Sequence, residues 1–338
     1  MTTLFIYIGV ILLASFIVWK GGGMLESSAE ALSYHYNLSP IAHGSVITAV
    51  GSSFPELSTT VISTLIHGQF DLGVSAIVGS AIFNILVIPG LSAILSKKME
   101  TNWNFVVKDV QYYITSLVML LLVFALAVIY NPIGDQSFTG EMTRPLAVLP
   151  IAFYFLYLYL QKQETKIYQN DKEEGKKEDK NIKKEWGKFF LSLILIVGSV
   201  EGLVRAAIFL GDYFNTASFV WGVLVLATAT SVPDAIISIR EAIHDKGMVS
   251  LANVIGSNIF DLLIAVPLGV LIAGSSSLNF KVAAPMMLFL GAATILLMFF
   301  LLRNQILTRK EGWWLLIIYA MFIVWIGLES FNVINWIG

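Results

Sequence analysis

Ten long apolar segments decide what this chain can fold into. A stretch of about 20 apolar residues has the length that an α-helix needs to cross the hydrocarbon core of a bilayer. The sequence therefore predicts an all-α integral membrane protein with ten transmembrane helices. The predicted spans are 3–22, 39–66, 71–95, 105–130, 145–161, 188–211, 216–243, 248–274, 280–302 and 312–330.

The composition agrees with a chain that lies in lipid. Of the 338 residues, 57% are hydrophobic and 13% are charged, whereas a soluble domain carries about 25% charged residues. The net charge of −2 gives no reason to expect a nucleic-acid partner. The absence of cysteine excludes thiol chemistry and a cysteine-bound zinc site. The first segment has no basic N-terminal region and no small-residue cleavage site, so we interpret it as a retained helix and not a signal peptide.

A hydrophilic segment at 162–187, dense in Lys and Glu, divides the spans into five and five. We assign 1–161 to a first five-helix repeat, 162–187 to a charged loop and 188–338 to a second five-helix repeat. Cytoplasmic loops of membrane proteins carry an excess of Lys and Arg. If the charged loop is cytoplasmic, most Lys and Arg residues near span ends fall on the same side. Both termini of this multi-pass cell-membrane protein would then lie outside.

The two halves are similar in sequence. The stretch GSVITAVGSSFPE at 44–56 matches GVLVLATATSVPD at 222–234, and IVGSAIFN at 77–84 matches VIGSNIFD at 254–261. Because each half holds an odd number of spans, the second copy must enter the membrane from the opposite side. Inverted repeats of this kind occur in many secondary transporters, whose substrate sites lie at the repeat interface beside discontinuous helices.

Both repeats carry proline inside a span and oxygen-bearing side chains around it. Pro55 and Pro233 should break the second and seventh helices, because proline lacks an N–H and clashes with the preceding turn. The breaks should free backbone carbonyls, with Ala49 and Ala227 the expected contributors. Hard cations such as Ca²⁺ and Na⁺ bind such oxygens, whereas softer metals favour thiolates or paired histidines. Four side-chain pairs lie four residues apart, on one helix face each: Ser52 with Glu56, Thr230 with Asp234, Ser80 with Asn84, and Ser257 with Asp261.

The acidic members of these pairs have no basic counterpart in the sequence. Glu56, Asp234 and Asp261 fall within predicted spans, and no lysine lies in the middle of any span. A carboxylate in mid-membrane costs several kcal/mol unless it is paired or neutralised. Three of them require bound cations or protons. An empty site would carry up to three negative charges and should cross the membrane rarely, so transport should be an obligatory exchange.

The paired motifs resemble the two alpha-repeat signatures of the cation/calcium exchanger superfamily, of prokaryotic type. They read GSSFPELSTT and GSAIFNILVIPG in the first half, and ATATSVPDAIIS and GSNIFDLLIAVPLG in the second. The resemblance implies exchange of Na⁺ for Ca²⁺ by alternating access, with the first and sixth helices sliding, and neither enzyme activity nor a cofactor. It also implies a metal-ion site in which carboxylates, a carboxamide, hydroxyls and two backbone carbonyls bind the ions. Those ligands are Glu56, Asp234, Asp261, Asn84, Ser52, Ser53, Ser80, Thr230, Ser231, Ser257, Ala49 and Ala227.

Several alternatives stay open. Asp234, Ala81 and Asp261 together are similar to the potassium-dependent branch, which co-transports K⁺, although Asp at position 261 also occurs in potassium-independent relatives. Ca²⁺/H⁺ exchange, in which the carboxylates would titrate, is the main rival to Na⁺ coupling. A closed cluster of carboxylates argues against a channel. We find no metalloprotease motif and no Ser/His dyad that would indicate an enzyme. Stoichiometry and oligomeric state cannot be derived.

Structural roles are the alternative to ion binding. Glu56 and Asp234 could act only as caps of half-helices, but that leaves the repeat and Asp261 unexplained. Glu201 and Arg205 are four residues apart, and we interpret them as a structural ion pair. His67 should lie in a loop or at the membrane interface, and Asn258 should lie behind the ligands without being one.

Overall fold

The computed structural model describes residues 1–36, 49–96, 99–103, 106–134, 138–168 and 182–330. Nine helices within these ranges are long and apolar enough to cross a membrane. They correspond to nine of the predicted spans and confirm an all-α multi-pass membrane protein. The tenth predicted span, 39–66, begins outside the described residues. Its described part consists of α2 (Ala49–Ser52) and α3 (Phe54–Leu65).

Three of the spanning helices contain π-helical stretches, and the others are continuous α-helices. The interrupted ones are η2 (Val106–Val110) with α6 (Gln111–Tyr130), α9 (Ser218–Trp221) with η3 (Gly222–Ala227) and α10 (Thr228–Ile243), and α11 (Gly247–Phe260) with η4 (Asp261–Ala265) and α12 (Val266–Ala273). The continuous ones are α1 (Thr2–His35), α4 (Phe70–Leu95), α7 (Arg144–Tyr168), α8 (Ile182–Phe214), α13 (Phe280–Asn304) and α14 (Arg309–Ser330).

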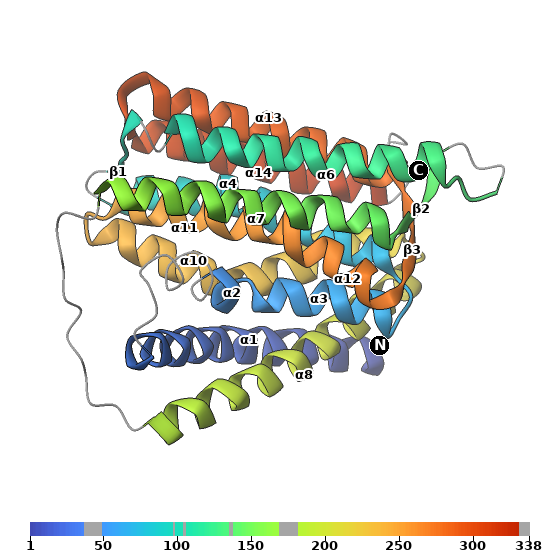
Figure 1. Cartoon of the computed structure of the whole chain (residues 1–338). Coiled ribbons are helices and arrows are strands. Elements are labelled where there is room, and N and C mark those ends of the chain that lie inside the picture. Colours follow the sequence, from blue (N-terminus) through green and yellow to red (C-terminus); the bar gives the residue numbers. More distant parts are fainter. Residues whose placement is uncertain (37–48, 97–98, 104–105, 135–137, 169–181, 331–338) are drawn as a thin grey trace.

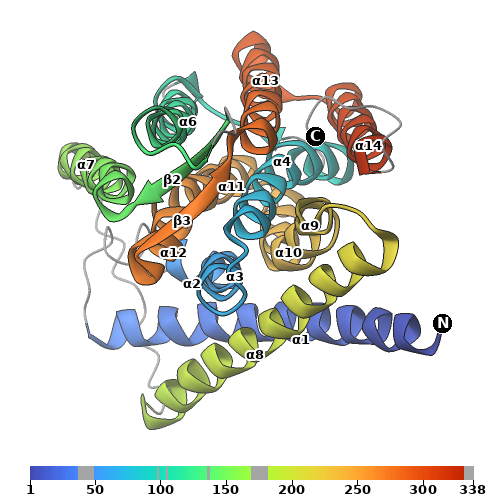
Figure 2. The same cartoon turned by 90° about the vertical axis from the view of Figure 1, so that its right-hand side faces the viewer.

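Helix α4 forms the centre of the bundle. It packs against α3, α10, η3, α11, α13 and α14, and most of its residues are buried. By contrast, α1 and α8 lie side by side along one edge, where α8 crosses α1 obliquely (Figures 1 and 2). The bundle therefore consists of a central group of helices that surround α4 and a separate helix pair against one side of it.

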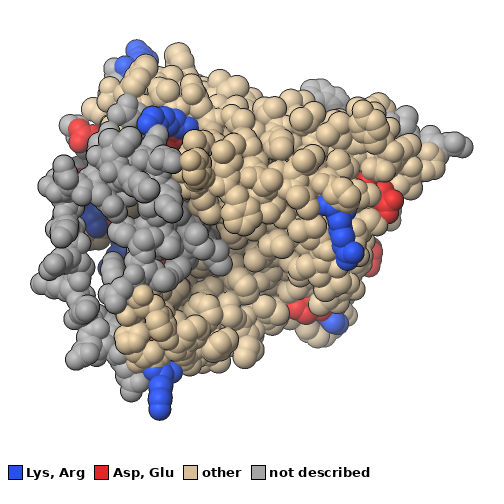
Figure 3. All heavy atoms as spheres, viewed as in Figure 1, with Lys and Arg blue, Asp and Glu red and all other residues tan. Residues whose placement is uncertain are grey.

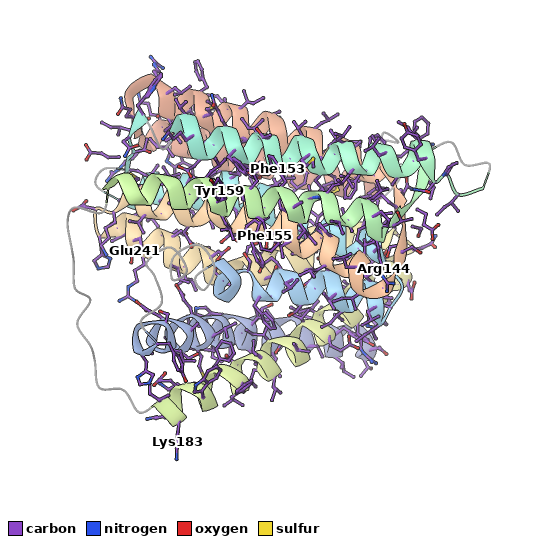
Figure 4. All side chains as sticks on the ribbon, viewed as in Figure 1. Arg144, Phe153, Phe155, Tyr159, Lys183 and Glu241 are labelled. Carbon is purple, nitrogen blue, oxygen red and sulfur yellow. The ribbon has the colours of Figure 1, made fainter. Side chains whose placement is uncertain are left out.

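The outside of the bundle is apolar over its middle and charged toward its ends. On the face in view, the Lys, Arg, Asp and Glu side chains lie near the two ends, with a band free of them between (Figure 3). Helix α7 presents Phe155 and Tyr159 along this band, 63% and 57% exposed (Figure 4). Arg144 lies at one end of the bundle and Lys183 at the other. Exposed aromatic side chains between charged ends are what a lipid-facing surface requires.

Two short antiparallel ribbons join the halves of the chain at opposite ends of the bundle (Figure 1). Strand β1 (Met99–Glu100) pairs with β4 (Ile306–Leu307). Strand β2 (Thr139–Thr143) pairs with β3 (Ser275–Asn279) in a five-residue register. The N-terminal end of α1 lies at the β2–β3 end, which the sequence analysis places outside the cell; the orientation stays a prediction.

The two proline motifs fold differently. At Pro55 the helix is interrupted, as predicted: α2 ends at Ser52, and Ser53 has non-helical angles of φ −91° and ψ 10°. The predicted break at Pro233 is wrong, because α10 continues through this residue. A spanning helix tolerates an interior proline when its neighbours and local π-helical adjustments satisfy the freed carbonyl. The π-helical segment η3 ends directly before α10, in the same spanning helix.

Several helices are longer than predicted. Helix α1 runs on to His35 instead of ending near residue 22, because Gly21 and Gly22 pack against neighbouring helices and do not mark a turn. A side-chain carbon at Gly21 would meet Ile196 at 3.0 Å, and one at Gly22 would meet the Pro233 ring at 3.2 Å. Helices α7 and α8 also extend into the predicted loop 162–187, to Tyr168 and from Ile182. Residues 169–181 lie outside the described residues.

The contact between α4 and η3 yields a test of the packing. A side-chain carbon at Gly79 would lie 2.9 Å from Ala227 Cβ and 3.1 Å from Val223 Cα. Gly79→Val should therefore separate the two helices and lower the free energy of unfolding by ~1–3 kcal/mol, as overpacking does. The measurement is a thermal melt of the detergent-solubilised protein. Gly198→Val is the control, since nothing lies within 4 Å of that position; equal melting temperatures for both variants would contradict the packing.

Candidate metal-ion site

Helix α4 and three neighbouring helical segments bring the predicted side chains together. Helices α2 and α3 and the residue between them carry the first group, α4 the second, α10 the third, and α11 with the start of η4 the fourth. Every one of these side chains is at most 3% exposed. The four groups are Ser52, Ser53 and Glu56; Ser80 and Asn84; Thr230, Ser231 and Asp234; and Ser257 and Asp261.

Hydrogen bonds join the two halves of the chain at this place. Ser52 Oγ lies 3.1 Å from Ser257 Oγ, and Ser80 Oγ lies 2.7 Å from Ser231 Oγ. Thus a hydroxyl of each proline motif contacts the serine of the GS motif in the other half. The two contacts are similar but not equivalent, because the alignment of the repeats pairs Ser52 with Thr230 and Ser231 with Ser53. The inverted repeat stays a prediction.

The three carboxyl groups form an acidic cluster, which we define as Glu56, Asp234 and Asp261. They are 1%, 0% and 0% exposed. Glu56 lies within electrostatic range of both aspartates, and Asp261 within range of Asp234. Across the described part of the chain, the ion pairs involve other acids, and none joins the acidic cluster to Lys, Arg or His. The cluster is thus buried without basic compensation, as the sequence predicts.

Several oxygen atoms of the site lack a hydrogen-bond partner although they are buried. They are Glu56 Oε2, Asp234 Oδ1, both carboxylate oxygens of Asp261, Asn84 Oδ1 and Ser53 Oγ. A buried polar atom without a partner costs free energy and requires an explanation such as an ion or water. The concentration of acceptors in one place favours a positively charged occupant.

The carboxylates are not close enough to bind an ion by themselves. Within the ranges described above, no three His, Cys, Asp or Glu side chains are grouped tightly enough to hold a metal ion. A cation in the acidic cluster would therefore need hydroxyl, carboxamide and backbone oxygens as well. Ala227 offers a carbonyl, which lies 3.4 Å from Thr230 Oγ1. Ala49 is the first residue of α2, next to residues outside the described ranges, and its role stays a prediction.

Two of the π-helical segments adjoin the site. Asp261 is the first residue of η4, and η3 ends at Ala227, directly before the helix that carries Thr230. In a π-helix the backbone bonds skip one more residue than in an α-helix, which turns the following side chains, and such segments occur frequently at functional sites. The sequence analysis missed both, since neither has a local residue signature comparable to that of Pro55.

A buried network lies directly behind Asn84. Asn84 Nδ2 donates to Asn258 Oδ1 at 3.0 Å and lies 3.5 Å from Asp234 Oδ2. Asn258 Nδ2 donates to the Tyr113 hydroxyl at 3.2 Å and to Ala81 O at 3.3 Å. Asn258 thus lies behind a ligand candidate, as expected. Tyr113 was not anticipated, because it sits in an apolar stretch of α6 that belongs to neither motif.

The predicted pair on α8 is confirmed, with an added partner. Arg205 Nε lies 2.6 Å from Glu201 Oε1. His67 Nε2, from the turn after α3, lies 3.0 Å from Glu201 Oε2. His67 therefore links this turn to α8 in addition to occupying the predicted loop position.

Comparisons with known proteins agree with the fold. The chain matches the family described as "Sodium/calcium exchanger protein" over residues 6–163 and 184–328. It is 27% identical over 289 residues to an uncharacterized membrane protein of Methanocaldococcus jannaschii, across 84% of this chain and 87% of that protein. It is 23% identical over 316 residues to the sodium/calcium exchanger MaX1 of Methanosarcina acetivorans, across 83% and 85%. The solved structure of the sodium-calcium exchanger NCX_Mj is similar in fold, with TM-score 0.63, 22% identity and coverage of 95% and 99%.

The membrane-spanning helices and the family match together identify a transmembrane ion antiporter. The chain belongs to the sodium/calcium exchanger protein family, of the prokaryotic type. This is a family of transporters and not of enzymes.

Charge repulsion within the acidic cluster yields a prediction about stability. Glu56→Gln removes one of three uncompensated charges, so the variant should melt at a higher temperature than the wild type without Ca²⁺. A ligand at about 100 times its Kd stabilises a protein by about 2.7 kcal/mol; the variant should lose most of this gain. Asp212→Asn, at an exposed residue of α8, is the matched control and should keep it. A variant that Ca²⁺ stabilises as strongly as the wild type would exclude Glu56 from the site.

Proposed function

We propose that this protein is a secondary active antiporter that exchanges Na⁺ for Ca²⁺ across the cell membrane by alternating access. The observation that carries the proposal is the acidic cluster, which is fully buried, lacks a basic partner among the described residues and contains four carboxylate oxygens without a hydrogen-bond partner. Both cations are hard ions that take oxygen ligands. They are cargo of the transporter, and no further cofactor is part of the proposal.

Charge balance accounts for the coupling of the two ions. Up to three negative charges repel one another in a low-dielectric site, and moving them through an occluded state is unfavourable. One Ca²⁺ or several Na⁺ would offset most of this charge. The loaded carrier would therefore change its conformation readily and the empty carrier rarely, which makes the exchange obligatory.

Alternating access requires that one group of helices moves relative to another. Helices α1 and α8, the first and sixth spans, pack extensively on each other at the edge of the bundle, and we expect them to be the pair that slides. At Gly22, α1 meets the Pro233 ring beside the acidic cluster. A contact between a glycine and a proline ring has no interlocking side chains and no hydrogen bond. This supports α1 as the element that slides past α10 and opens the site to either side in turn.

Transport by the reconstituted protein tests the proposal. We expect Ca²⁺ efflux from proteoliposomes to depend on an opposing Na⁺ gradient, and Glu56→Gln or Asp234→Asn to abolish it while the protein still inserts. Asp212→Asn should transport like the wild type. The measurement is radiotracer Ca²⁺ flux, with Na⁺, K⁺ and pH gradients varied separately.

Each gradient separates one alternative. Flux that follows a pH gradient instead of Na⁺ would identify a Ca²⁺/H⁺ exchanger. A requirement for K⁺ together with Na⁺ would place the chain in the potassium-dependent branch, which Asp234, Asp261 and Ala81 resemble. Full-rate Ca²⁺ efflux with no counter-cation on the opposite side would refute obligatory exchange.

A further inference from the structure

The side chain of Asn84 poses a question of orientation. A carboxamide carries an oxygen that accepts and an NH₂ that donates, and the two ends differ little in shape. Only the oxygen binds a cation, whereas the NH₂ would repel it. Asn84 is 0% exposed, so water cannot correct a wrong orientation. The hydrogen-bond partners of Asn84 must therefore decide where its carboxamide oxygen points.

The hydrogen-bond network behind Asn84 determines this orientation. A backbone carbonyl can only accept, so Ala81 O requires the NH₂ end of Asn258. The oxygen end of Asn258 then faces Asn84 and requires the NH₂ end of that residue, 3.0 Å away. The NH₂ end of Asn84 also lies 3.5 Å from Asp234 Oδ2, so both of its neighbours fix it as a donor. The oxygen end of Asn84 is consequently left as the end without a hydrogen-bond partner.

Tyr113 secures the second N–H of Asn258. Its hydroxyl accepts from Asn258 Nδ2 at 3.2 Å, and the residue is 0% exposed within the core of the bundle. Without this hydroxyl, one N–H of a buried carboxamide would lose its acceptor, which costs free energy. The orientation of the Asn258 carboxamide, which fixes the orientation of Asn84, would then be less stable.

We propose that Tyr113 is a positioning residue of the ion site, which acts through Asn258 to present the carboxamide oxygen of Asn84 to the transported cation. This inference rests on the proposed function of the acidic cluster as a cation site. It assigns a role in ion binding to α6, a helix outside both repeat motifs.

The unequal sequences of the repeats support this assignment. The counterpart of Asn84 in the second repeat is Asp261, and the counterpart of Asn258 in the first repeat is Ala81. A carboxylate has oxygens at both ends and presents an acceptor in either orientation. It needs no orienting neighbour, and the structure has an alanine at the position that would supply one. Asn84 thus has an orienting partner in Asn258, whereas Asp261 has only Ala81 at the equivalent position.

Removal of the hydroxyl tests the inference. Tyr113→Phe keeps the ring and the packing, and it should raise the Kd for Ca²⁺ about three- to tenfold, the range expected for loss of one buried hydrogen bond. The maximal exchange rate should stay within about twofold, because the change acts on ion affinity. Ca²⁺ should be affected more than Na⁺, since the interaction of an ion with an oriented dipole grows with the charge of the ion. Equilibrium ⁴⁵Ca²⁺ binding to the solubilised protein measures the Kd, and vesicle flux measures KM and the maximal rate.

The neighbouring tyrosine provides a matched control. The Tyr112 hydroxyl donates to Phe153 O at 2.7 Å and faces away from this network. Tyr112→Phe therefore removes one hydroxyl from the same helix and should leave the Kd for Ca²⁺ unchanged. An equal rise in Kd for both variants, or a Kd for Tyr113→Phe equal to that of the wild type, would overturn the inference.

A double variant tests whether Tyr113 acts through Asn258. If it does, adding Tyr113→Phe to Asn258→Ala should not weaken Ca²⁺ binding further. Additive effects of the two substitutions would refute the linkage. The binding assay also separates this inference from the proposed function. Suppose that Tyr113→Phe raises the Kd for Ca²⁺ as predicted, but the wild type does not exchange Ca²⁺ for Na⁺. This result would refute the proposed coupling and leave the positioning role intact.

Discussion

Burying a carboxylate away from water and from positive charge costs several kcal/mol, and the centre of this protein contains three such groups. Glu56, Asp234 and Asp261 lie among hydroxyls, a carboxamide and backbone carbonyls. Even with these neighbours, four of the carboxylate oxygens have no hydrogen-bond partner. The helices that surround α4 thus hold together an arrangement that is unfavourable when empty. A positively charged occupant would offset this cost, and the offset would contribute to its binding free energy. The proposed function therefore depends on the charge balance of the cluster.

Neither half of the chain builds this arrangement alone. Serine pairs connect the first proline motif to the second GS motif and the first GS motif to the second proline motif. The halves nevertheless differ at one pair of equivalent ligand candidates. A carboxylate stands at position 261 and a carboxamide at position 84, and the carboxamide alone has a buried amide and a tyrosine behind it. Both repeats supply oxygen atoms to the site, and residues that differ between the repeats set the orientation of an individual ligand.

Features that depend on composition and spacing could be predicted from the sequence, and features that depend on packing could not. Span lengths identified nine of the helices, and the repeated motifs identified side chains that do come together. The interruption at Pro55 was predictable, but proline alone does not decide between a break and an accommodated bend, as Pro233 demonstrates. Tyr113 could not be found, because a tyrosine in an apolar helix is usually a core residue, and its partner lies 145 positions away in the sequence.

The two β-ribbons have a consequence for the order in which the chain can mature. Strand β1 near residue 100 finds its partner only near residue 306, and β2 pairs with a strand near residue 277. A nascent chain emerges N-terminal end first, so both early strands must wait until most of the later helices have been synthesised. During this interval their edges are unpaired. The first five helices therefore enter the bilayer as an unfinished assembly, and native structure at both ends is completed only when translation has nearly ended.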